Sequence, residues 1–361
     1  MKIAFFGLPQ TGKSTVFGLL TKVKSLEIKY DQTGSPVPRV GMVNVPDSRL
    51  EFLASIFKPK KVVHAQIEYT DIVGLKFGDV KENRLLAYLR QSDVLAHIIR
   101  AFKNDAVFHS AGDIDPLRDA QKMEDEIQLS DLILIEGRLE RLKKNVQRSK
   151  NPEDELQLAT LEKIRPHLEA GKPLREADLK PDEEKSLRSF GFLSLKPLQL
   201  IINIGEDQIA GAEKIVTETM KPFLSKKMVS VSYICAPIET EIAEMEKNDA
   251  SAFMADYGLK DLGYERLITN SYELLGLISF LTVGEDECRA WPIPSGLKAN
   301  EAAGQIHTDI QRGFIAAQVI KYTDFKTLSD INALKQKGLV KIEGRDYLVQ
   351  DGDIIEYRFN V

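Results

Sequence analysis

The sequence predicts a doubly wound α/β domain with a mostly parallel sheet, interrupted by a helical insertion and followed by a small β-rich module. First, an apolar strand at Lys2–Phe6 leads through a glycine-bounded loop into a helical stretch at Thr15–Thr21. Second, later apolar runs alternate with helical stretches, as in parallel sheets with crossovers; these runs end at Asp71, Arg100, Asn203 and Ile234. Third, the composition changes at residues 113–195 and again from Leu277.

Length and composition narrow the class of protein. The 361 residues allow two or three domains at about 100 to 200 residues each. With 49 basic and 54 acidic residues the net charge is −5, so a nucleic-acid partner would need a local patch, and no DNA partner is expected. Two cysteines, Cys235 and Cys288, support neither a disulfide framework nor a zinc site. No window approaches the roughly 18 apolar residues of a membrane span, so we expect a cytoplasmic protein without membrane contact.

The loop after the first strand matches the phosphate-binding pattern GxxxxGK[ST] in full, between a strand and a helix as the motif requires. Backbone N–H groups of such a loop surround the phosphates, Lys13 pairs with the β- and γ-phosphates as a catalytic cation, and Ser14 supplies a hydroxyl to Mg²⁺. A chance match is rejected because the context is right. The residues expected to bind the nucleotide here are Leu8, Pro9, Gln10, Thr11, Gly12, Lys13, Ser14 and Thr15.

Asp71-Ile72-Val73-Gly74 follows an apolar strand and reads as DxxG. The Asp71 carboxylate is expected to hold Mg²⁺ through its water shell, and the Gly74 amide to meet the γ-phosphate. If the spacing of this motif is considered alone, the alternative is that Asp71 is an ordinary aspartate in the turn after a strand. The next residue is Leu75 and not the glutamine that orients water in many GTPases.

Asn203-Ile204-Gly205-Glu206 stands where guanine-specific enzymes carry NKxD. The missing lysine and the longer acid, Glu206, make guanine specificity doubtful, whereas the Asn203 amide matches the donor and acceptor of adenine as a bidentate pair. A polar connection without a ligand is the alternative. Cys235-Ala236, after the next strand, is similar to the loop that closes over the base in such enzymes.

The insertion at residues 113–195 predicts two antiparallel helices joined near residues 149–153. Apolar residues recur at helical spacing in two stripes: Leu132, Ile135, Leu139, Leu142 and Val146, then Leu158, Leu161, Ile164 and Leu168. A first helix over about 116–148 would be roughly 50 Å long. Residues 138–150 carry six basic residues and one acidic residue, net +5, which suits contact with a phosphate backbone; a solvated helix face is the alternative.

From Leu277 the chain predicts a small mixed β module, with a hairpin turn at Asp351-Gly352 between DYLVQ and DIIEYRF. Residues 277–361 hold ten basic and twelve acidic residues, so charge alone predicts no RNA affinity for this module. Trp291, the single tryptophan, is expected to pack in its core.

Five segments together resemble the YchF subfamily of Obg-like ATPases: GLPQTGKST, DIVGL, NIGE, ICAPIETEIAEM, and the C-terminal AAGQIHTDIQRGFIAAQVI with EGRDYLVQDGDIIEYRFNV. The resemblance covers essentially the whole chain. It implies a P-loop NTPase domain at 1–112 and 196–276, a coiled-coil arm at 113–195 and a β-grasp-like TGS domain at 277–361. It also implies ATP preferred over GTP, slow hydrolysis with Mg²⁺, and association with ribosomes and ribosomal RNA.

Further site residues follow from that resemblance. His109 lies near the family's mobile-loop histidine, which would replace the absent glutamine as the catalytic group; a surface histidine without a role is the alternative. Phe102 resembles an aromatic residue beside the adenine, with a core position as the alternative. Ile204 and Gly205 are inferred to touch the base through their backbone.

Two segments depart from the family pattern. Gln10 stands where the family usually has Asn. In the switch I region, where the family usually has a Thr before a PNVG-like turn, this chain reads TGSPVPRVG, which leaves Ser35 or Thr33 as the magnesium partner. The leading hypothesis is a slow ATPase switch that binds ribosomes and modulates translation or a stress response. The alternatives are a nucleotide-dependent ribosome- or RNA-binding module with little hydrolysis, and an ordinary GTPase.

Overall fold

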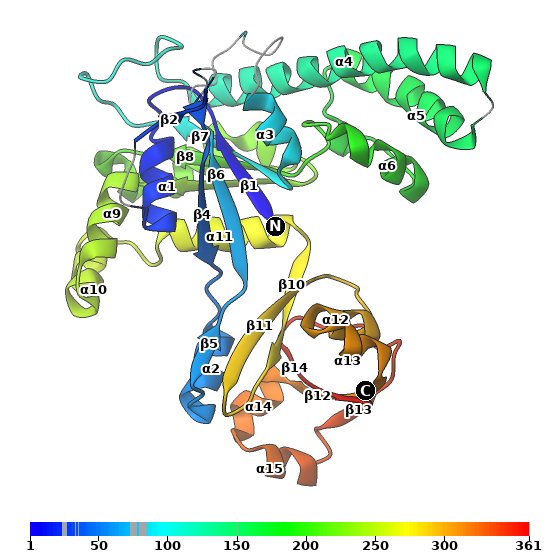
Figure 1. The fold of residues 1–361 in the computed structure, drawn as a ribbon. Coiled ribbons are helices and arrows are strands. Elements are labelled where there is room, and N and C mark those ends of the chain that lie inside the picture. The colour runs from blue at the N-terminus through cyan, green and yellow to red at the C-terminus, as the bar shows by residue number, and fades with distance from the viewer. Residues whose placement is uncertain are drawn as a thin grey trace. The chain divides into compact units, whose positions relative to one another are not determined.

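The computed structural model describes residues 1–23, 27–32, 34, 36–72, 78, 85–149 and 151–360, which form two compact units (Figure 1). The first unit consists of Met1–Val43 and Glu68–Leu274, and the second of Asn44–Ile67 and Leu275–Val361. None of the helices in these described ranges combines the length and apolarity needed to cross a membrane.

The first unit is built on a six-stranded sheet in the order β4-β6-β1-β7-β8-β9. Its strands are β1 (Lys2–Phe6), β4 (Arg39–Asn44), β6 (Gln66–Asp71), β7 (Val94–Arg100), β8 (Leu198–Asn203) and β9 (Val229–Ile234). β1 pairs in parallel with β6 and β7, and β7, β8 and β9 continue in parallel. Every residue of β7 and β8 is buried, as apolar runs in a sheet covered on both faces require. The doubly wound α/β prediction is confirmed.

Helices flank this sheet, and a short ribbon of β2 (Lys29–Tyr30) and β3 (Pro36–Val37) precedes β4. The helices outside the insertion are α1 (Lys13–Thr21), α3 (Leu85–Gln91), α7 (Ala212–Thr219), α8 (Lys221–Leu224), α9 (Ala236–Glu244), α10 (Lys247–Asp256) and α11 (Gly263–Leu274). Because β1, β6, β7 and β8 run in parallel, their carboxyl ends open on one edge of the sheet, where the phosphate loop, Asp71, Arg100 and Asn203 are found.

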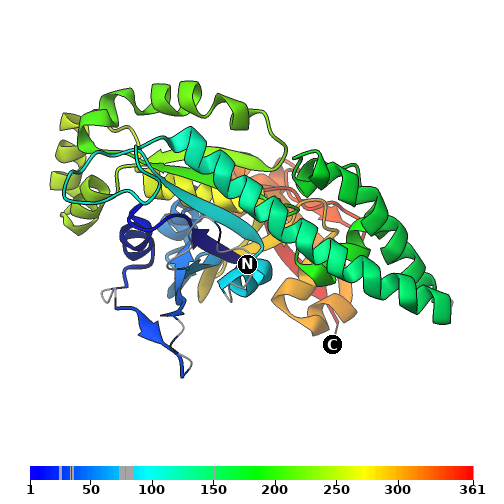
Figure 2. The same cartoon turned by 90° about the horizontal axis from the view of Figure 1, so that it is seen from above.

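The insertion between β7 and β8 contains α4 (Pro116–Arg148), α5 (Pro152–Glu169) and the shorter α6 (Pro181–Leu187). α4 and α5 lie side by side as an elongated pair (Figures 1 and 2). They begin at caps provided by Asp115 and Asn151, whose side chains accept backbone N–H groups. Most of both predicted stripes form one apolar cluster: Ile135, Leu139, Leu142, Leu161, Ile164 and Leu168, with Leu132 and Leu158 against it. The predicted helical pair is confirmed.

Asp131, fully buried on α4, fixes the pair to the sheet domain. Its carboxylate accepts from the Arg90 guanidinium at 2.9 Å and from the backbone N–H groups of Leu193 and Ser194 at 3.0 and 2.7 Å. Burial raises the pKa of this carboxyl, and the three donors oppose that rise. The root of the arm is therefore held by hydrogen bonds on three sides.

The second unit has its own six-stranded sheet, in the order β13-β12-β14-β10-β11-β5. Its strands are β5 (Lys61–Val63), β10 (Leu277–Thr282), β11 (Glu287–Pro294), β12 (Phe314–Lys321), β13 (Lys341–Glu343) and β14 (Asp353–Phe359). Its helices are α2 (Ser48–Phe57), α12 (Ala299–Ile306), α13 (Thr308–Arg312), α14 (Tyr322–Leu328) and α15 (Ile331–Gln336). Trp291 stacks on Phe280, and its indole N–H donates to Thr282 at 3.0 Å, as its expected packing role implies.

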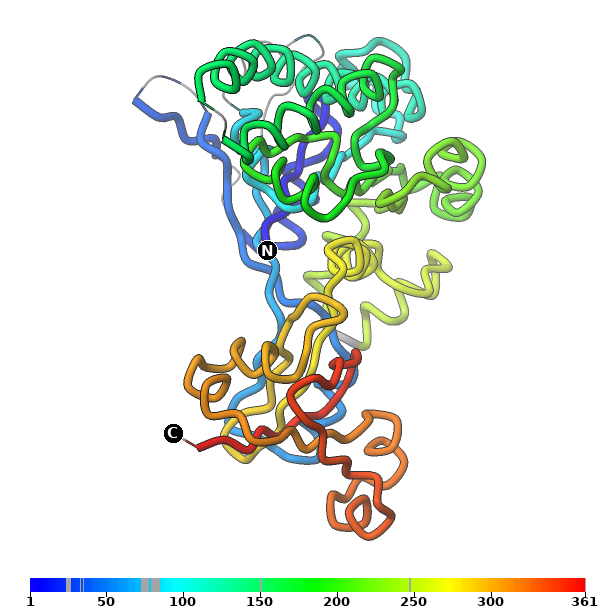
Figure 3. Tube along the Cα trace, turned by 90° about the vertical axis from the view of Figure 1, so that its right-hand side faces the viewer, coloured from blue at the N-terminus to red at the C-terminus, as the bar shows by residue number. Residues whose placement is uncertain are grey.

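Residues 44–67 differ from the expected boundaries, which left them with the P-loop domain. Leu50 and Leu53 of α2 pack in one apolar cluster with Leu281 and Cys288 of the second unit. β5 pairs in parallel with β11, and the tube in Figure 3 shows this early segment, in blue, beside the yellow strands. Residues 44–67 belong to the second unit because the apolar face of α2 is buried by residues more than two hundred positions later in the chain.

The hairpin expected at Asp351-Gly352 is wrong. The two residues do form a turn, with Gly352 at a φ of 80°. However, β14 pairs with β12 and β10, and the preceding DYLVQ segment forms no strand with it. Side-chain hydrogen bonds take the place of the strand-to-strand backbone hydrogen bonds of a hairpin. Asp353 accepts from the Gln350 backbone N–H at 2.9 Å, and Asp351 accepts from the Ser279 backbone N–H at 2.9 Å.

Candidate functional site

The phosphate loop connects β1 to α1, and two of its glycines cannot be replaced. Gly7 has a φ of 138°, and a Cβ there would lie 2.5 Å from the Ile98 carbonyl oxygen. Gly12 has a φ of 89°, and a Cβ there would lie 2.2 Å from the Asn203 amide nitrogen. Leu8 and Thr11 are buried, Pro9 and Gly12 are half-buried, and Gln10 and Thr15 are exposed. Gly12 caps α1 without a side-chain hydrogen bond, so the first N–H groups of α1 stay available for an anion.

Lys13 is buried at the start of α1. Its ammonium donates to the carbonyl oxygens of Gly7, at 2.9 Å, and Leu8. Burial lowers the pKa of Lys13 to about 8, and the negative charge of Asp71 opposes this fall. The ammonium thus lies inside the loop it would share with the phosphates, bound to carbonyl oxygens that a phosphate would replace.

The two expected magnesium ligands come together at the ends of β6 and the loop. The Ser14 hydroxyl donates to Asp71 Oδ2 at 3.1 Å. Asp71 is fully buried, and its Oδ1 has no hydrogen-bond partner among the residues that the structure describes. Hydroxyl and carboxylate oxygens are hard ligands of the kind that Mg²⁺ prefers, and a buried carboxylate oxygen without a partner fits a bound cation. The residues present therefore fit this ion.

Several expected contacts lie outside the described residues. They are the switch I candidates Thr33 and Ser35, and the DxxG residues Gly74 and Leu75. Their roles toward Mg²⁺ and the γ-phosphate stay predictions.

Asn203 ends β8 and ties together two loops of the site. Its amide nitrogen donates to the Thr11 carbonyl at 3.0 Å, and its amide oxygen accepts from the Ala236 backbone N–H at 3.3 Å. Each end of the amide keeps one further bonding position. The expected bidentate contact with adenine stays a prediction, but the side chain also has a structural task.

Phe102 and Glu206 lie on the same side as Asn203. The Phe102 backbone N–H donates to the Asn203 carbonyl at 3.2 Å, and Phe102 Cβ would lie 3.5 Å from a Cβ added at Gly205. Glu206 is exposed and accepts from the Tyr257 hydroxyl at 2.7 Å. The Ile204 side chain is buried and its N–H donates to the Ile234 carbonyl at 2.9 Å. The backbone contact of Ile204 and Gly205 with the base stays a prediction.

Cys235 and Ala236 begin α9 and are both buried. Burial raises the pKa of the Cys235 thiol to about 11, which keeps it uncharged. Beside them, buried Glu239 accepts from the Tyr264 backbone N–H at 2.8 Å and from that of Cys235 at 3.4 Å. Burial raises the pKa of Glu239 to about 7 against these donors and the charge of Arg266. Glu239 thus shapes the loop expected to cover the base.

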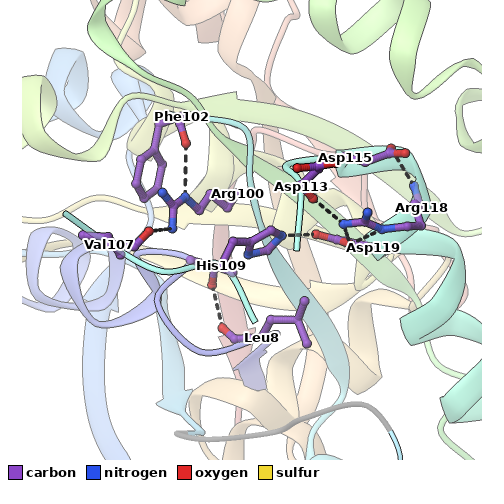
Figure 4. Close-up of polar contacts among 10 residues, drawn as sticks. Leu8, Arg100, Phe102, Val107, His109, Asp113, Asp115, Arg118 and Asp119 are labelled. Carbon is purple, nitrogen blue, oxygen red and sulfur yellow. Dashed lines mark hydrogen bonds and ion pairs between the residues drawn. The ribbon is translucent and has the colours of Figure 1, made fainter. Parts of the chain in front are cut away.

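His109 is buried, and not at the surface as the alternative interpretation required. Its Nε2 lies 2.8 Å from Asp119 Oδ2, in the first turn of α4, while its Nδ1 is buried without a hydrogen bond in the described part of the chain. Figure 4 shows the imidazole directed toward Asp119, with Leu8 of the phosphate loop beside it. A polar nitrogen buried without a partner costs free energy, so Nδ1 is an atom at which a hydrogen-bonding group would be stabilising.

Arg100 holds the loop that carries His109. Its guanidinium donates to the carbonyl oxygens of Phe102 and Val107 at 3.1 and 2.9 Å (Figure 4), and to that of Asn104 at 3.1 Å. The same guanidinium lies 4.4 Å from the centre of the Phe102 ring. One arginine therefore shapes both the histidine loop and the aromatic residue expected beside the base.

The tip of the α4–α5 pair keeps most of its expected positive charge. Arg141, Lys143, Lys144 and Arg148 are exposed, although Lys143 lies 3.2 Å from Glu162 of α5. Arg138 differs from the expectation, because its guanidinium turns inward to within 5.4 Å of the Phe190 ring. Lys150 lies outside the described residues.

Three site residues escaped the sequence interpretation: Arg39, Asp119 and Tyr257. Arg39 on β4 contacts both Ser14 and Asp71. Its signal is visible in the sequence, since PRVG puts Arg where the resemblance has the Asn of PNVG. Asp119 lies in α4 and Tyr257 directly after α10, and nothing in the neighbouring sequence marks either residue.

Comparisons with known proteins show the family of the chain. Residues 277–360 match the family model described as YchF-GTPase_C, protein of unknown function (DUF933). The chain is 36% identical over 362 residues to the "Ribosome-binding ATPase YchF" of Bacillus subtilis, covering 98% of each. It is 38% identical to the protein of that name from Haemophilus influenzae, covering 100% of this chain and 99% of the relative. The solved YchF GTPase of Schizosaccharomyces pombe superposes with a TM-score of 0.83 at 28% identity, covering 99% of this chain and 97% of that one.

Proposed function

The chain belongs to the YchF family of ribosome-binding ATPases, and on that premise we propose that it is a slow ATP-hydrolysing switch protein that binds ribosomes in the cytoplasm. One observation carries the proposal: side chains suited to a triphosphate and a metal converge on one sheet edge, with Lys13 inside the loop and Ser14 bonded to Asp71 at 3.1 Å.

Lys13 and the N–H groups of the loop would hold the triphosphate, and Ser14 and Asp71 would hold Mg²⁺. When bound, Mg²⁺ supplies positive charge to the β- and γ-phosphates and lowers the barrier to loss of the γ-phosphate. Ser14 contributes its hydroxyl oxygen, and Asp71 contributes a carboxylate whose position is fixed by burial.

His109 is our candidate for orienting the attacking water, because Leu75 has no polar group to do so. Its unpartnered Nδ1 is the atom available for that hydrogen bond, while Asp119 fixes the ring through Nε2. Since His109 is buried, its loop would have to shift before a water could reach the ring.

The base side favours ATP over GTP. Guanine recognition of the NKxD kind needs a lysine directly after the asparagine and an aspartate three residues after it. This chain has Ile204 and Glu206 at those two positions. The Glu206 carboxylate is engaged by Tyr257, which further weakens it as an acceptor for the guanine N–H groups. The free N–H and lone pair of the Asn203 amide suit adenine.

The ribosome is the proposed macromolecular partner, with ribosomal RNA as the surface that the arm contacts. The exposed cations at the tip of α4 supply the charge for phosphate contacts. Nucleotide state would act through the switch loops on how this arm is presented.

The test is to follow phosphate release from ATP and from GTP by the purified chain with Mg²⁺, with and without ribosomes. We expect ATP turnover that exceeds GTP turnover and is lost in Lys13→Ala, since the site then lacks its central cation. Ribosome binding that depends on ATP, with no hydrolysis above that of Lys13→Ala, would favour the nucleotide-dependent binding module instead. Faster GTP turnover would favour an ordinary GTPase.

A further inference from the structure

A guanidinium already occupies the position expected for the metal. Arg39, on β4, donates from one nitrogen, Nη2, to both the Ser14 hydroxyl oxygen and Asp71 Oδ2. Its side chain is only 11% exposed, and it lies over the Phe17 ring at 5.6 Å. The Ser14 hydroxyl and the Asp71 carboxylate are also the two groups that the proposed function assigns to Mg²⁺.

The remaining donors of Arg39 point to a second ligand. Its Nε and Nη1 are buried and have no hydrogen-bond partner within the described ranges. A guanidinium has five N–H groups, and leaving several of them buried and unused costs free energy unless an acceptor arrives. Among the described residues the carboxylate that Arg39 contacts is Asp71, and that contact uses only Nη2 and Oδ2. The acceptor that fits is a phosphate oxygen, for which a guanidinium fork is well suited.

We propose that Arg39 is an internal substitute for Mg²⁺, which neutralises Asp71 in the metal-free protein and donates through Nε and Nη1 to the phosphates of a nucleotide bound without metal. The inference rests on the proposed function, because it needs a nucleotide at this site. Because the guanidinium holds the Ser14 oxygen and one oxygen of Asp71, Mg²⁺ can bind both groups only after Arg39 leaves them.

This exclusion changes the linkage between metal and nucleotide in a defined direction. Arg39 strengthens nucleotide binding without Mg²⁺ and opposes the entry of Mg²⁺ with it. Both effects reduce the ratio of the nucleotide dissociation constant in EDTA to that in Mg²⁺. Removing the guanidinium therefore raises this ratio twice over: the dissociation constant in EDTA increases, and the dissociation constant in Mg²⁺ decreases.

The experiment measures that ratio with a fluorescent ATP analogue on the full chain, for wild type, Arg39→Gln and Arg39→Lys. We expect the ratio to rise at least tenfold in Arg39→Gln and less in Arg39→Lys, which keeps the charge but loses the fork. Arg312→Gln, which removes an exposed guanidinium from the second unit, is the matched control and should keep the wild-type ratio.

The outcomes separate the two proposals. If wild type binds the analogue in neither condition, the proposed function fails. If wild type binds it and Arg39→Gln keeps or lowers the ratio, the function stands and the role of Arg39 is overturned. Because Arg39→Gln leaves buried Asp71 without its cation, thermal unfolding is recorded for each variant. If Arg39→Gln does not fold, Arg39→Lys decides, and an unchanged ratio there overturns the proposal.

Discussion

The imidazole Nε2 of His109 and the carboxylate Oδ2 of Asp119 lie 2.8 Å apart, with both side chains only 3% exposed. Asp119 belongs to the first turn of α4, the long helix of the arm. Its other oxygen accepts from the Arg118 guanidinium at 2.8 Å, so the pair is fixed from both sides. The histidine proposed to orient water is therefore attached to the helix whose far end is proposed to meet the ribosome.

The first prediction concerns that histidine. His109→Ala should lower turnover of ATP by about 100-fold, the lower range for loss of a positioned acid or base, with little change in ATP affinity. Single-turnover hydrolysis and analogue binding separate the two effects. Asp119→Asn, which keeps the hydrogen bond but not the charge, should fall between wild type and His109→Ala. Wild-type turnover in His109→Ala, alone and with ribosomes, would assign the catalytic group to a partner.

The second prediction concerns the base. Wild type should bind ATP more tightly than GTP, and the double variant Glu206→Asp, Ile204→Lys should shift preference toward GTP. Competition between the two nucleotides for the fluorescent analogue measures this preference. Because Ile204 is buried, unfolding is measured alongside. Tyr257→Phe is the comparison variant: it frees Glu206 from its hydrogen bond but leaves the acid at its full length, so it should shift the preference toward GTP less than the double variant does. A wild-type preference for GTP would contradict the assignment.

The third prediction concerns the arm. Reversing Lys143, Lys144 and Arg148 to Glu should weaken ribosome association and flatten its salt dependence, while ATP hydrolysis without ribosomes stays unchanged. Sedimentation with ribosomes over a range of salt concentrations measures this.

A matched control reverses three exposed lysines of the sheet domain, Lys214, Lys221 and Lys227, with the same change in net charge. Equal losses in both triple variants would mean that net charge, and not the arm tip, governs association.

The fourth prediction concerns pH. The pKa of Glu239 is raised by burial from 4.5 to about 7, so the folded protein holds this proton more tightly than the unfolded chain. Its contribution to the free energy of unfolding is fully present below about pH 4.5 and is lost as the pH rises through 7. Relative to wild type, Glu239→Gln should therefore gain about 3 kcal/mol across that window.

Urea unfolding of both proteins between pH 4.5 and 7.5 measures this difference. Glu241→Gln, at an exposed position of the same helix, is the control and should follow wild type. A constant difference between Glu239→Gln and wild type would show that Glu239 titrates normally.

Sequence patterns predicted the strands of the first sheet well, because each strand is an apolar run that stops at a recognisable residue. The apolar runs ending at Asp71, Arg100, Asn203 and Ile234 are the strands β6, β7, β8 and β9, each ending at the expected residue. The phosphate loop could be predicted from its two glycines and from the apolar strand and helical stretch on either side of it. Pairings between distant segments were not predictable, and β5 joining β11 is the clearest case, since nothing within Lys61–Val63 specifies that neighbour.

The site divides in the same way. Lys13, Ser14 and Asp71 carry a motif, so their convergence could be expected. PRVG marks Arg39 as a departure from the family pattern, but its contacts with Ser14 and Asp71 depend on how β4 lies against β6 and could not be read from the sequence. The burial of His109 likewise depends on Asp119, a helix residue that no motif marks.

The single tryptophan has a spectroscopic consequence. Trp291 lies in β11, with its ring against Phe280 and the Arg289 guanidinium 4.0 Å from its centre. All indole emission therefore originates in the second unit, and the nucleotide-binding unit contributes only tyrosine signal. Emission excited at the red edge of the absorption band should follow the melting of the second unit alone, while far-ultraviolet circular dichroism follows both. Two midpoints in a denaturant titration would give the separate stabilities of the units without any label.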